Sequence, residues 1–441
     1  MTDALDTHHK ALALNLDPSK YGVIAEIGAG QEVARWFFRV GAAAGTVAKT
    51  LSAYDMAVSD ALYGQSSRYV ARDRLAAMLG VEYDRLVAQV ADERGPESTF
   101  FAFADTLSAR NFKGTNVCHG WMGLCFQPEP GAEPSSVQLH IGMSDSTNLL
   151  QQQAVGVLGV NLIHAAFFRL ENLTTFLESL REGIGFERIE VDHIEFKGSA
   201  FDSFGSADAP LGLLRAGLSE AVLYAGGEDL DSTSDPMSTV YKRPIVVERD
   251  IFSGASEDYV RILDESAAAL ANEASDARHE PIALYEISLE NSASNEARTD
   301  SQVLELVHRL RATGRPVLLT RFTETYHLTP YLKRYSDQPI RFAMSLLNLM
   351  QIFHEDYYED LDGGMVEAIS RLMSTDVRLY VVPMDVEALR SDLSGIAGES
   401  SLWKLPETGL ATVENIEPKG RVRHLYRYLH ELGALKTIRG G

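Results

Sequence analysis

A strand, a glycine turn and a helix follow one another near the start of the chain, within residues 21–54. Residues 23–27 form a short apolar run, Gly28 and Gly30 flank a single alanine, and a helical pattern begins directly after them. A strand that passes through a tight glycine turn into the N-terminus of a helix is a common phosphate or nucleotide cradle in α/β proteins. The same arrangement also turns a chain where no ligand binds. It therefore predicts an α/β fold and leaves open whether the turn forms a site.

The balance of charge limits the classes of partner. The 441 residues include 62 Asp and Glu against 40 Lys and Arg, which gives a net charge of −22. A field of that sign repels nucleic acid and anionic membranes, so we expect neither as a partner. The start of the chain lacks the pattern of a signal peptide, and the most apolar stretch, residues 154–168, is too short and too polar to span a bilayer. Cys118 and Cys125 match no common zinc or thioredoxin spacing, so we expect a cytoplasmic protein with free thiols.

The length of the chain and the alternation of its patterns predict two domains. In the first half, periodicity predicts helices over residues 45–62, 69–90, 148–168 and 173–183, and strands over 98–105, 124–127, 137–143 and 188–196. The acidic residues 226–238 are expected to form a loop. Later strands, over 242–252, 282–289, 316–322, 340–344 and 377–383, alternate with helices as in βαβ units.

These patterns predict an α/β fold with mixed or mostly parallel sheets flanked by helices, in two lobes. Residues 1–20 are expected to be an N-terminal extension, 21–255 a first α/β domain and 256–441 a second α/β domain. Faint similarity between GVIAEIG and IALYEIS leaves open a duplicated unit.

The sequence EIGAG, residues 26–30, resembles the first motif of S-adenosylmethionine-dependent methyltransferases. In that family the next strand should end in an acidic residue, whereas the residues after this turn have a helical pattern. The dinucleotide-binding pattern fails as well, because its third glycine is absent. A phosphate cradle without either pattern remains open. Gly28, Gly30 and Gln31 would supply backbone donors, and Arg35 and Lys49 would supply positive charge. The alternative is a turn with solvated cations, and no cofactor is identified.

A second candidate lies in the Gly- and Asn-rich residues 111–123, which we expect to form a loop after a strand. Loops on a rigid scaffold are where sites concentrate. His119 is the candidate for proton transfer and Arg110 for holding an anion, with Lys113 and Asn116 as further ligand-binding candidates. The alternative is a packed loop without a site.

Polar side chains on the apolar helix 148–168 form a third candidate. Asn161 and His164 are three residues apart, so they share one face of the helix. Unpaired buried amides cost about 1–3 kcal/mol each, so these groups either line a pocket or bond a neighbouring loop. No metal site is expected, because Asp192 and His193 would point to opposite faces of a strand.

Several stretches together resemble one family. The segments IAEIGAGQEVARWFF, CHGWMG, GVNLIHAAFF, RIEVDHIEF and DLDGGMVEAISRLM are similar to a set of bacterial and plant proteins of similar length, over about residues 20–385. The resemblance implies no catalytic residues, because no activity is established for that family. Two labels attach to it, a TonB-dependent receptor and a nicotinate- or nicotinamide-mononucleotide adenylyltransferase. The chain has neither the alternating ten-residue strands of the first nor the HxGH-type motif of the second.

Taken as a whole, the chain is expected to bind a small anionic ligand, a nucleotide or a phosphorylated metabolite, near the glycine turn and the loop 111–123. If it is an enzyme, we expect one of transferase type. Two alternatives remain open: a homo-oligomeric scaffold or regulatory protein without enzymatic activity, and an S-adenosylmethionine-dependent methyltransferase. The scaffold is favoured by the lack of a complete catalytic motif and by the aromatic runs RWFF and YY. We expect a homo-oligomer.

Overall fold

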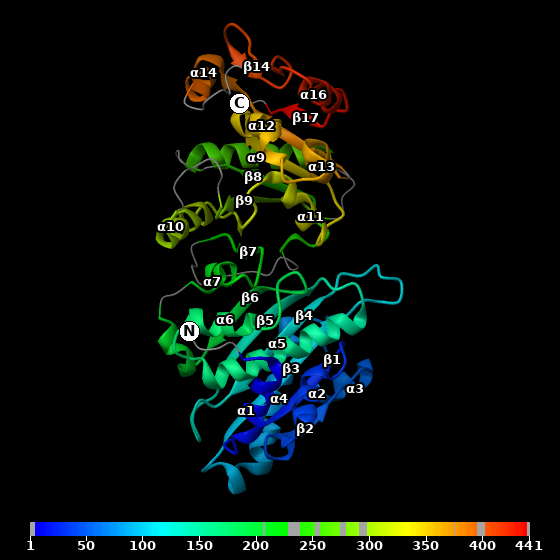
Figure 1. Cartoon of the computed structure of the whole chain (residues 1–441), viewed down its shortest axis with the longest axis vertical. Coiled ribbons are helices and arrows are strands. Elements are labelled where there is room, and N and C mark those ends of the chain that lie inside the picture. Colours follow the sequence, from blue (N-terminus) through cyan, green and yellow to red (C-terminus); the bar gives the residue numbers. More distant parts are fainter. Residues whose placement is uncertain are drawn as a thin grey trace. The chain divides into compact units, whose positions relative to one another are not determined.

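The computed structural model describes residues 5–205, 208–227, 239–250, 252, 256–273, 279–290, 298–374, 376–394 and 402–438. Residue contacts divide the chain into two compact units, Met1–Val222 and Leu223–Gly441, which Figure 1 colours from blue to green and from green to red. The boundary expected from the sequence, after residue 255, lies further along the chain. It differs because strands that the sequence analysis assigned to the first lobe belong to the sheet of the second unit.

The first unit is built on a mixed sheet of six strands in the order β2-β1-β3-β4-β5-β6. The strands are β1 (Lys20–Ile27), β2 (Val47–Leu51), β3 (Thr99–Ser108), β4 (His119–Phe126), β5 (Ser135–Met143) and β6 (Ile189–Lys197). β1 pairs in parallel with β2 and β3, whereas β3, β4, β5 and β6 pair antiparallel in succession. The C-terminal ends of β1, β3 and β5 and the N-terminal end of β4 therefore lie at one edge of the sheet.

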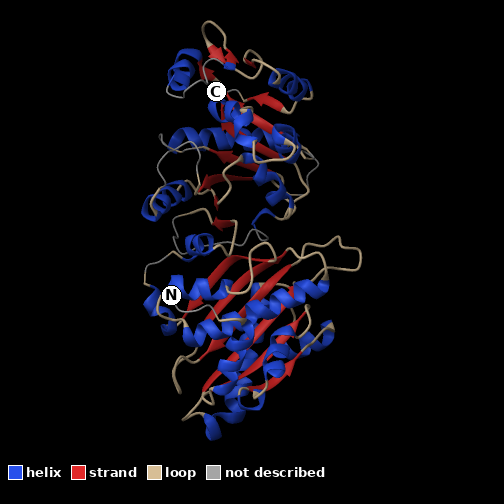
Figure 2. Cartoon of the chain, viewed as in Figure 1, coloured by secondary structure: helices blue, strands red, loops and turns tan. Residues whose placement is uncertain are grey.

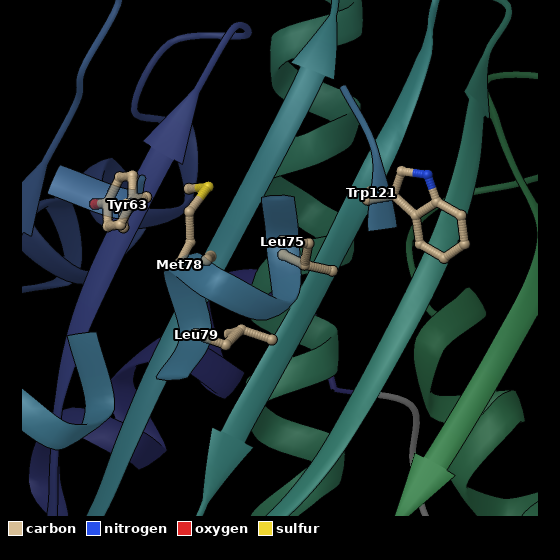
Figure 3. Close-up of a cluster of buried hydrophobic side chains, with 7 residues drawn as sticks. Tyr63, Leu75, Met78, Leu79 and Trp121 are labelled. Atoms are coloured by element: carbon tan, nitrogen blue, oxygen red, sulfur yellow. The ribbon is translucent and has the colours of Figure 1, made fainter. Parts of the chain in front are cut away.

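Helices cover both faces of this sheet. On one face pack α1 (Thr7–Leu16), α2 (Glu32–Val40), α5 (Asn148–Phe168) and α6 (Leu173–Arg181), and the other carries α3 (Met56–Tyr63) and α4 (Arg72–Arg94). The sequence of α4 places Leu75, Met78 and Leu79 on one side of the helix, as a core-facing stripe requires. Figure 3 shows these side chains over the sheet with Tyr63 of α3 and Trp121 of β4.

The central helix α5 is apolar on nearly every side because it is enclosed by the sheet and by neighbouring helices. Two glycines allow α2 to approach it closely. A Cβ atom at Gly159 would lie 2.3 Å from Cγ2 of Val33, and one at Gly156 would lie 2.9 Å from Cβ of Glu32.

Residues 1–20 do not form a detached extension in this structure, because they contain α1 and the first residue of β1. Ala11 and Leu14 of α1 are fully buried, and the helix contacts α2 and α5. The cap residue Asp6 accepts a hydrogen bond from the N–H of His9 at 2.8 Å, which fixes the start of the helix. The N-terminal helix is therefore part of the core of the first unit.

Two local predictions for the first unit differ from the structure. Residues 45–62 were expected to be helical, but β2 lies within them and pairs in parallel with β1. Residues 111–123 were expected to be a loop, but β4 begins at His119 and takes up the last part of them. In both places alanine or glycine residues interrupt the alternation of apolar and polar residues by which a strand is recognised in a sequence.

The second unit is built on a sheet of seven strands in the order β17-β12-β11-β8-β9-β10-β7. The strands are β7 (Ala221–Tyr224), β8 (Ile245–Arg249), β9 (Ile282–Ser288), β10 (Val317–Thr320), β11 (Ile340–Ser345), β12 (Val377–Val382) and β17 (Leu435–Thr437). All pairings from β17 to β10 are parallel. The strands are buried almost throughout, as strands covered on both faces require.

Helices alternate with these strands (Figure 2). They are α9 (Ser256–Glu273), α10 (Asp300–Arg311), α11 (Leu328–Lys333), α12 (Leu346–Ile352), α13 (Gly364–Leu372), α14 (Val386–Ser394) and α16 (Val422–Glu431), while α7 (Ala209–Ala216) precedes β7. Two small ribbons pair β13 (Met384–Asp385) with β15 (Leu410–Ala411), and β14 (Trp403–Lys404) with β16 (Glu417–Pro418). Short 3-10 turns are η1 (Ala43–Gly45), η2 (Ser199–Phe204), η3 (Thr325–His327) and η4 (Glu355–Tyr358).

The predicted α/β fold with mixed sheets flanked by helices is confirmed. The two sheets have different strand orders, so the topology of one unit does not repeat in the other. Most of the predicted loop 226–238 lies outside the described residues.

Candidate functional site

The glycine turn after β1 is shaped by a close approach to β3. Gly28 has a φ of 105°, and a Cβ atom there would lie 1.9 Å from the carbonyl oxygen of Leu107, so only glycine fits. Gly30 has a φ of 86°, and its N–H donates to the hydroxyl of Tyr54 at 3.0 Å. Gly28 therefore serves the close packing of two backbone segments, whereas Gly30 serves a backbone conformation that favours glycine.

The first amides of α2 are occupied by a side chain of the protein itself. Glu26, near the end of β1, accepts hydrogen bonds from the N–H groups of Val33 and Ala34, both at 3.0 Å. Its carboxylate lies where an anion would bind at a free helix N-terminus. A ligand at Gly30 and the exposed Gln31 would bind beside this carboxylate, so the turn offers fewer donors than the sequence predicts.

A second carboxyl group lies next to Glu26. Asp105 of β3 is its direct neighbour in the parallel pairing, and Oδ1 of Asp105 accepts from the N–H of Ile27 at 3.0 Å. Burial raises the pKa of Glu26 to about 7. Burial, and then the charge of Glu26, raise the pKa of Asp105 well above its usual value. Burial therefore favours the protonated form of both neighbouring carboxyl groups.

The cations predicted for the glycine turn lie on opposite faces of the sheet. Arg35 of α2 lines a surface hollow together with Arg39 and Arg188. Lys49 of β2 instead reaches α4, where its Nζ lies 2.6 Å from the buried Glu82. Arg35 and Lys49 therefore do not meet at one site.

The loop between β3 and β4 is closed by Asn116. Its Nδ2 donates to the hydroxyl of Ser108 at 3.1 Å and to the carbonyl of Ala109 at 2.8 Å, and its Oδ1 accepts from the N–H of Asn111 at 2.8 Å. The amide of Asn116, predicted to bind a ligand, holds the loop together.

The loop and the glycine turn approach the same end of α5. The N–H of Arg110 donates to Oε1 of Gln151 at 3.0 Å, and a Cβ atom at Gly30 would lie 3.5 Å from the side chain of Gln152. Arg110 and Lys113 are both exposed. The glycine turn and the loop between β3 and β4 thus both lie beside the first turn of α5.

His119 is half-buried on the α4 face of the sheet, opposite to the face that carries α2. Its Nδ1 lies 3.0 Å from Nε2 of His140, on the neighbouring strand β5. Cys118, the preceding residue, does not join this contact, because its Sγ lies 3.8 Å from the carbonyl oxygen of Asn116. Both cysteines are free.

Asn161 and His164 lie in the core, on the other side of the sheet from His119. The Nδ2 of Asn161 donates to the carbonyls of Leu180 and Glu182 at 2.9 and 2.8 Å, and its Oδ1 accepts from Lys10 at 2.9 Å. Burial lowers the pKa of His164 to about 3, so this imidazole is neutral. The amide of Asn161 is fully used in joining α1, α5 and α6.

The second unit has a strand order that creates a ligand site in many α/β proteins. From β8 the chain builds outward through β9 to β10, then returns to the other side of β8 for β11 and continues to β12. In open α/β sheets, ligands bind outside the C-terminal ends of the strands at the point where the order reverses. That point lies between β8 and β11.

A crevice of about 800 Å³, including the part that opens to solvent, lies at this point. Its lining contains Arg249 and Asp250 at the end of β8, Ser288 at the end of β9, Thr323 beyond β10 and Met344 near the end of β11. Side chains of α12 and η4 complete it. The ends of four neighbouring strands therefore meet at one hollow.

Arg249 is held in the crevice by three groups and retains an unused donor. Its Nη2 donates to the carbonyls of Phe322 and Thr323 at 2.9 and 2.6 Å, and its Nε lies 3.5 Å from the buried Glu286. Its Nη1 is buried and has no hydrogen-bond partner among the described residues. An unmade hydrogen bond of this kind costs about 1–3 kcal/mol, which a ligand oxygen would recover.

Arg298 brings a second guanidinium to the crevice. Burial, and then the charge of Arg309, lower the pKa of Arg298 from its ordinary value. The crevice also contains two carboxylates, Asp250 and Glu324, and the aromatic side chain of Tyr357. This combination suits a ligand with an anionic group at one end and hydroxyl groups at the other.

Sequence reasoning singled out none of the crevice residues as a site. The strands were predicted, but their order depends on long-range pairing that no local pattern reveals. The signal that could have identified the crevice is positional: Arg249 and Ser288 each end an apolar run of strand type.

Among the described residues, the groups with metal-ligand geometry are Asp6, His8 and His9, all exposed at the cap of α1. This cluster is explained by the hydrogen bond from Nδ1 of His9 to Asp6 at 2.8 Å. In the part of the chain that the structure describes, no helix has both the length and the apolar composition needed to cross a membrane.

Comparison with known proteins shows a remote structural similarity only. No family model matches the sequence, and no curated protein matches it. A competence/damage-inducible protein, CihA from Agrobacterium tumefaciens, is 15% identical with a TM-score of 0.28, and the match covers 36% of this chain and 95% of that chain. A CinA superfamily protein from Enterobacter cloacae is 13% identical with a TM-score of 0.27, covering 37% and 94%. These similarities are too low to transfer an activity or a site.

Proposed function

We propose that the protein binds a small anionic ligand, a nucleotide or a phosphorylated metabolite, in the crevice at the C-terminal ends of β8, β9 and β11. The observation that carries the proposal is the position of this crevice at the point where the strand order reverses. The site differs from the one expected at the glycine turn, where Glu26 occupies two amides of α2.

The charges in the crevice support an anionic group next to polar groups. Arg249 and Arg298 offer the donors that bind phosphate or carboxylate oxygens. Asp250 and Glu324 offer acceptors of the type that bind ribose hydroxyls in nucleotide sites. The aromatic ring of Tyr357 supplies a surface for a planar base.

The test is a ligand screen of the full chain by thermal shift and titration calorimetry, with ATP, NAD, nicotinamide mononucleotide and S-adenosylmethionine. We expect at least one of them to raise the melting temperature. Arg298→Ala should then weaken binding about tenfold or more, because a charge-assisted hydrogen bond contributes about 1.5–3 kcal/mol. Arg315→Ala is the matched control, because Arg315 lies outside the crevice lining and pairs with Asp264.

Two results would overturn the proposal. One is the absence of binding by every compound in the screen. The other is a loss of affinity in Arg35→Ala or Arg110→Ala, with Arg298→Ala unchanged, which would return the site to the glycine turn of the first unit.

The second candidate function is a homo-oligomeric scaffold without enzymatic activity, and exposed apolar side chains favour it. Phe38 of the RWFF run is 56% exposed and Met56 of α3 is 62% exposed, whereas Phe37 and Tyr358 are buried. Light scattering on the eluted protein distinguishes the two. An assembly that dissociates on Phe38→Ser would support the scaffold, and a monomer would exclude it.

A further inference from the structure

A surface hollow of the first unit lies beside the contact between α2 and α5. Its volume is about 620 Å³, including the part that opens to solvent. The lining includes Arg35, Trp36 and Arg39 of α2, Gln153 and Val157 of α5, and Arg188 just before β6. None of these residues lines the crevice of the second unit, so the hollow is a separate feature.

The sequence of α2 turns charged side chains toward this hollow. Glu32, Trp36 and Arg39 follow one another at intervals of four and three residues, so they share one face of the helix. Val33 and Phe37, on the other side, are fully buried in the core. The lining groups of α2 therefore stand on a helix whose opposite side is fixed by core packing.

The lining carries three guanidinium groups, which differ in how fully they are paired. Nη1 of Arg35 lies 2.9 Å from Oε1 of Glu32, and Nε of Arg188 lies 2.9 Å from Oδ2 of Asp145. The side chain of Arg39 has neither an ion pair nor a hydrogen bond with any described residue. Because a guanidinium group has five N–H donors, all three arginines retain donors for a ligand.

Arg39 is held at the hollow by an aromatic ring. Its Cζ lies 5.3 Å from the centroid of the ring of Trp36, three residues earlier on α2. This cation–π contact restricts the guanidinium group without using its N–H donors. Less side-chain freedom is then lost when an anion binds. Arg39 is therefore a partly positioned cation without a counter-ion among the described residues.

The balance of charge at the hollow indicates which kind of anion it suits. Arg35 is paired with Glu32 and Arg188 with Asp145, so the positive charge of Arg39 remains to be balanced. A carboxylate carries one negative charge and balances it. A phosphate monoester carries about −1.5 to −2 at pH 7, and its additional charge would lie close to Glu32. The balance therefore favours a carboxylate.

We infer that the hollow is a binding site for a small organic carboxylate with an apolar or aromatic body. Arg35 and Arg39 are four residues apart on α2, with Cβ atoms about 5–6 Å from each other, so both can donate to one carboxylate. The half-buried Val157 and Trp36 supply an apolar surface for the body of the ligand. The inference does not depend on the ligand proposed for the second unit.

The test titrates the full chain with benzoate, followed by tryptophan fluorescence and by calorimetry. Trp121 and Trp403 are 5% and 4% exposed, so a change in fluorescence should come from the half-buried Trp36. We expect saturable binding of benzoate. Benzamide has a similar shape without the charge and should bind at least about tenfold more weakly, because it forms no charge-assisted hydrogen bond with arginine. Phenyl phosphate should also bind more weakly than benzoate.

Arg39→Met should weaken the binding of benzoate at least about tenfold, because it removes the cation that has no counter-ion. Arg94→Met is the matched control. Arg94 is also an exposed arginine beside an aromatic ring, with its Cζ 4.2 Å from the ring centroid of Tyr21, and it lies outside the hollow. We expect this control to bind benzoate with the affinity of the wild-type protein.

Two further variants change the charge of the hollow without altering its arginines. Gln153 is exposed on α5, so substitutions there should leave the fold intact. Gln153→Glu should weaken the binding of benzoate and Gln153→Lys should strengthen it, each about fivefold. Gln65→Glu, at an exposed position after α3, is the control for the change in net charge and should have no such effect.

Several results would overturn the inference. They are the absence of saturable benzoate binding, equal affinities for benzamide and benzoate, equal effects of Arg39→Met and Arg94→Met, and unchanged affinity in both Gln153 variants. Tighter binding of phenyl phosphate than of benzoate would contradict the assignment to a carboxylate. Binding that is lost in Arg298→Ala and kept in Arg39→Met would place benzoate in the crevice of the second unit instead.

Discussion

The Nζ atom of Lys10 lies 2.6 Å from a carboxylate oxygen of Glu182, inside the core of the first unit. Lys10 is completely buried, and it also donates to the backbone carbonyl of Ser179 at 2.8 Å and to Asn161. Burial lowers the pKa of Lys10 and its contacts with Glu182 oppose the shift. The side chain of Lys10 thus joins α1, which the sequence analysis assigned to an extension, to the core of the first unit.

Lys10→Met should destabilise the first unit by about 3–5 kcal/mol, because it leaves the partners of a buried charge without their donor. The measurement is urea unfolding monitored by circular dichroism at pH 7. Lys113→Met is the matched control, since Lys113 is exposed, and should stay within about 0.5 kcal/mol of wild type. Equal effects of the two substitutions would show that α1 is not a core element.

Gly28→Ala should destabilise the protein more than Gly41→Ala, although both glycines have a positive φ. A Cβ atom at Gly41 meets no atom of the described residues within 4 Å, so we expect that substitution to carry backbone strain alone, about 1–2 kcal/mol. At Gly28 the new atom would also overlap the carbonyl of Leu107. Thermal melting of the two variants compares the effects, and similar melting temperatures would contradict the close approach of β1 and β3.

Glu26→Gln should reduce the dependence of stability on pH. The pKa of Glu26 is raised from 4.5 to about 7, so the folded protein holds this proton more tightly than the unfolded chain. The free energy of unfolding should therefore fall as pH rises from about 4.5 to about 7, by an amount on the order of 3 kcal/mol. The glutamine side chain does not titrate, so most of this fall should be absent in the variant.

The check is urea unfolding at a series of pH values from 4 to 8. Asp92→Asn, an exposed carboxylate on α4, should leave the wild-type curve unchanged. A curve for Glu26→Gln that follows wild type through this whole window would argue against a raised pKa of Glu26.

Glu248→Gln should stabilise the second unit at alkaline pH. Glu248 is buried on β8, and neither carboxylate oxygen has a hydrogen-bond partner among the described residues. Burial, and then the charge of Asp250, raise the pKa of Glu248 to about 9. Wild-type stability should therefore decline from about pH 4.5 to about pH 9, by several kcal/mol.

The glutamine variant does not titrate, so its melting temperature should exceed that of wild type at pH 9 and approach it at pH 5. Glu257→Gln, at the exposed start of α9, is the control. If both variants melt like wild type at pH 9, then Glu248 is ionised at little cost and is better solvated than the structure indicates.

Local patterns predicted the strands β8 to β12 of the second unit closely, because strands such as Ile282–Ser288 are short apolar runs between polar breaks. They did not predict β7, β17, α14 or α16. They missed β2, whose residues Val47–Leu51 follow alanines and include a lysine that pairs with α4. A strand at the edge of a sheet needs fewer apolar residues, so its pattern resembles that of a surface helix.

The sites were harder to predict, because they depend on which strands become neighbours. His119 was proposed as a candidate from its sequence context, but its contact with His140, and that of His140 with Asp192, depends on strand pairing and on a bulge that no spacing rule encodes. The opposite error occurred at the glycine turn. There the sequence predicts that the first amides of α2 are available to a ligand, whereas in the structure two of them donate to the carboxylate of Glu26.

The strand β7 comes first in the chain among those of its sheet, yet it pairs with β10, after β8, α9, β9 and α10. All four of its residues are buried in the finished protein. During synthesis, at roughly 5–20 residues per second, this apolar segment leaves the ribosome several seconds before its partner exists. The newly made chain therefore passes through an interval in which β7 is unpaired and accessible to chaperones. Slower translation should lengthen this interval.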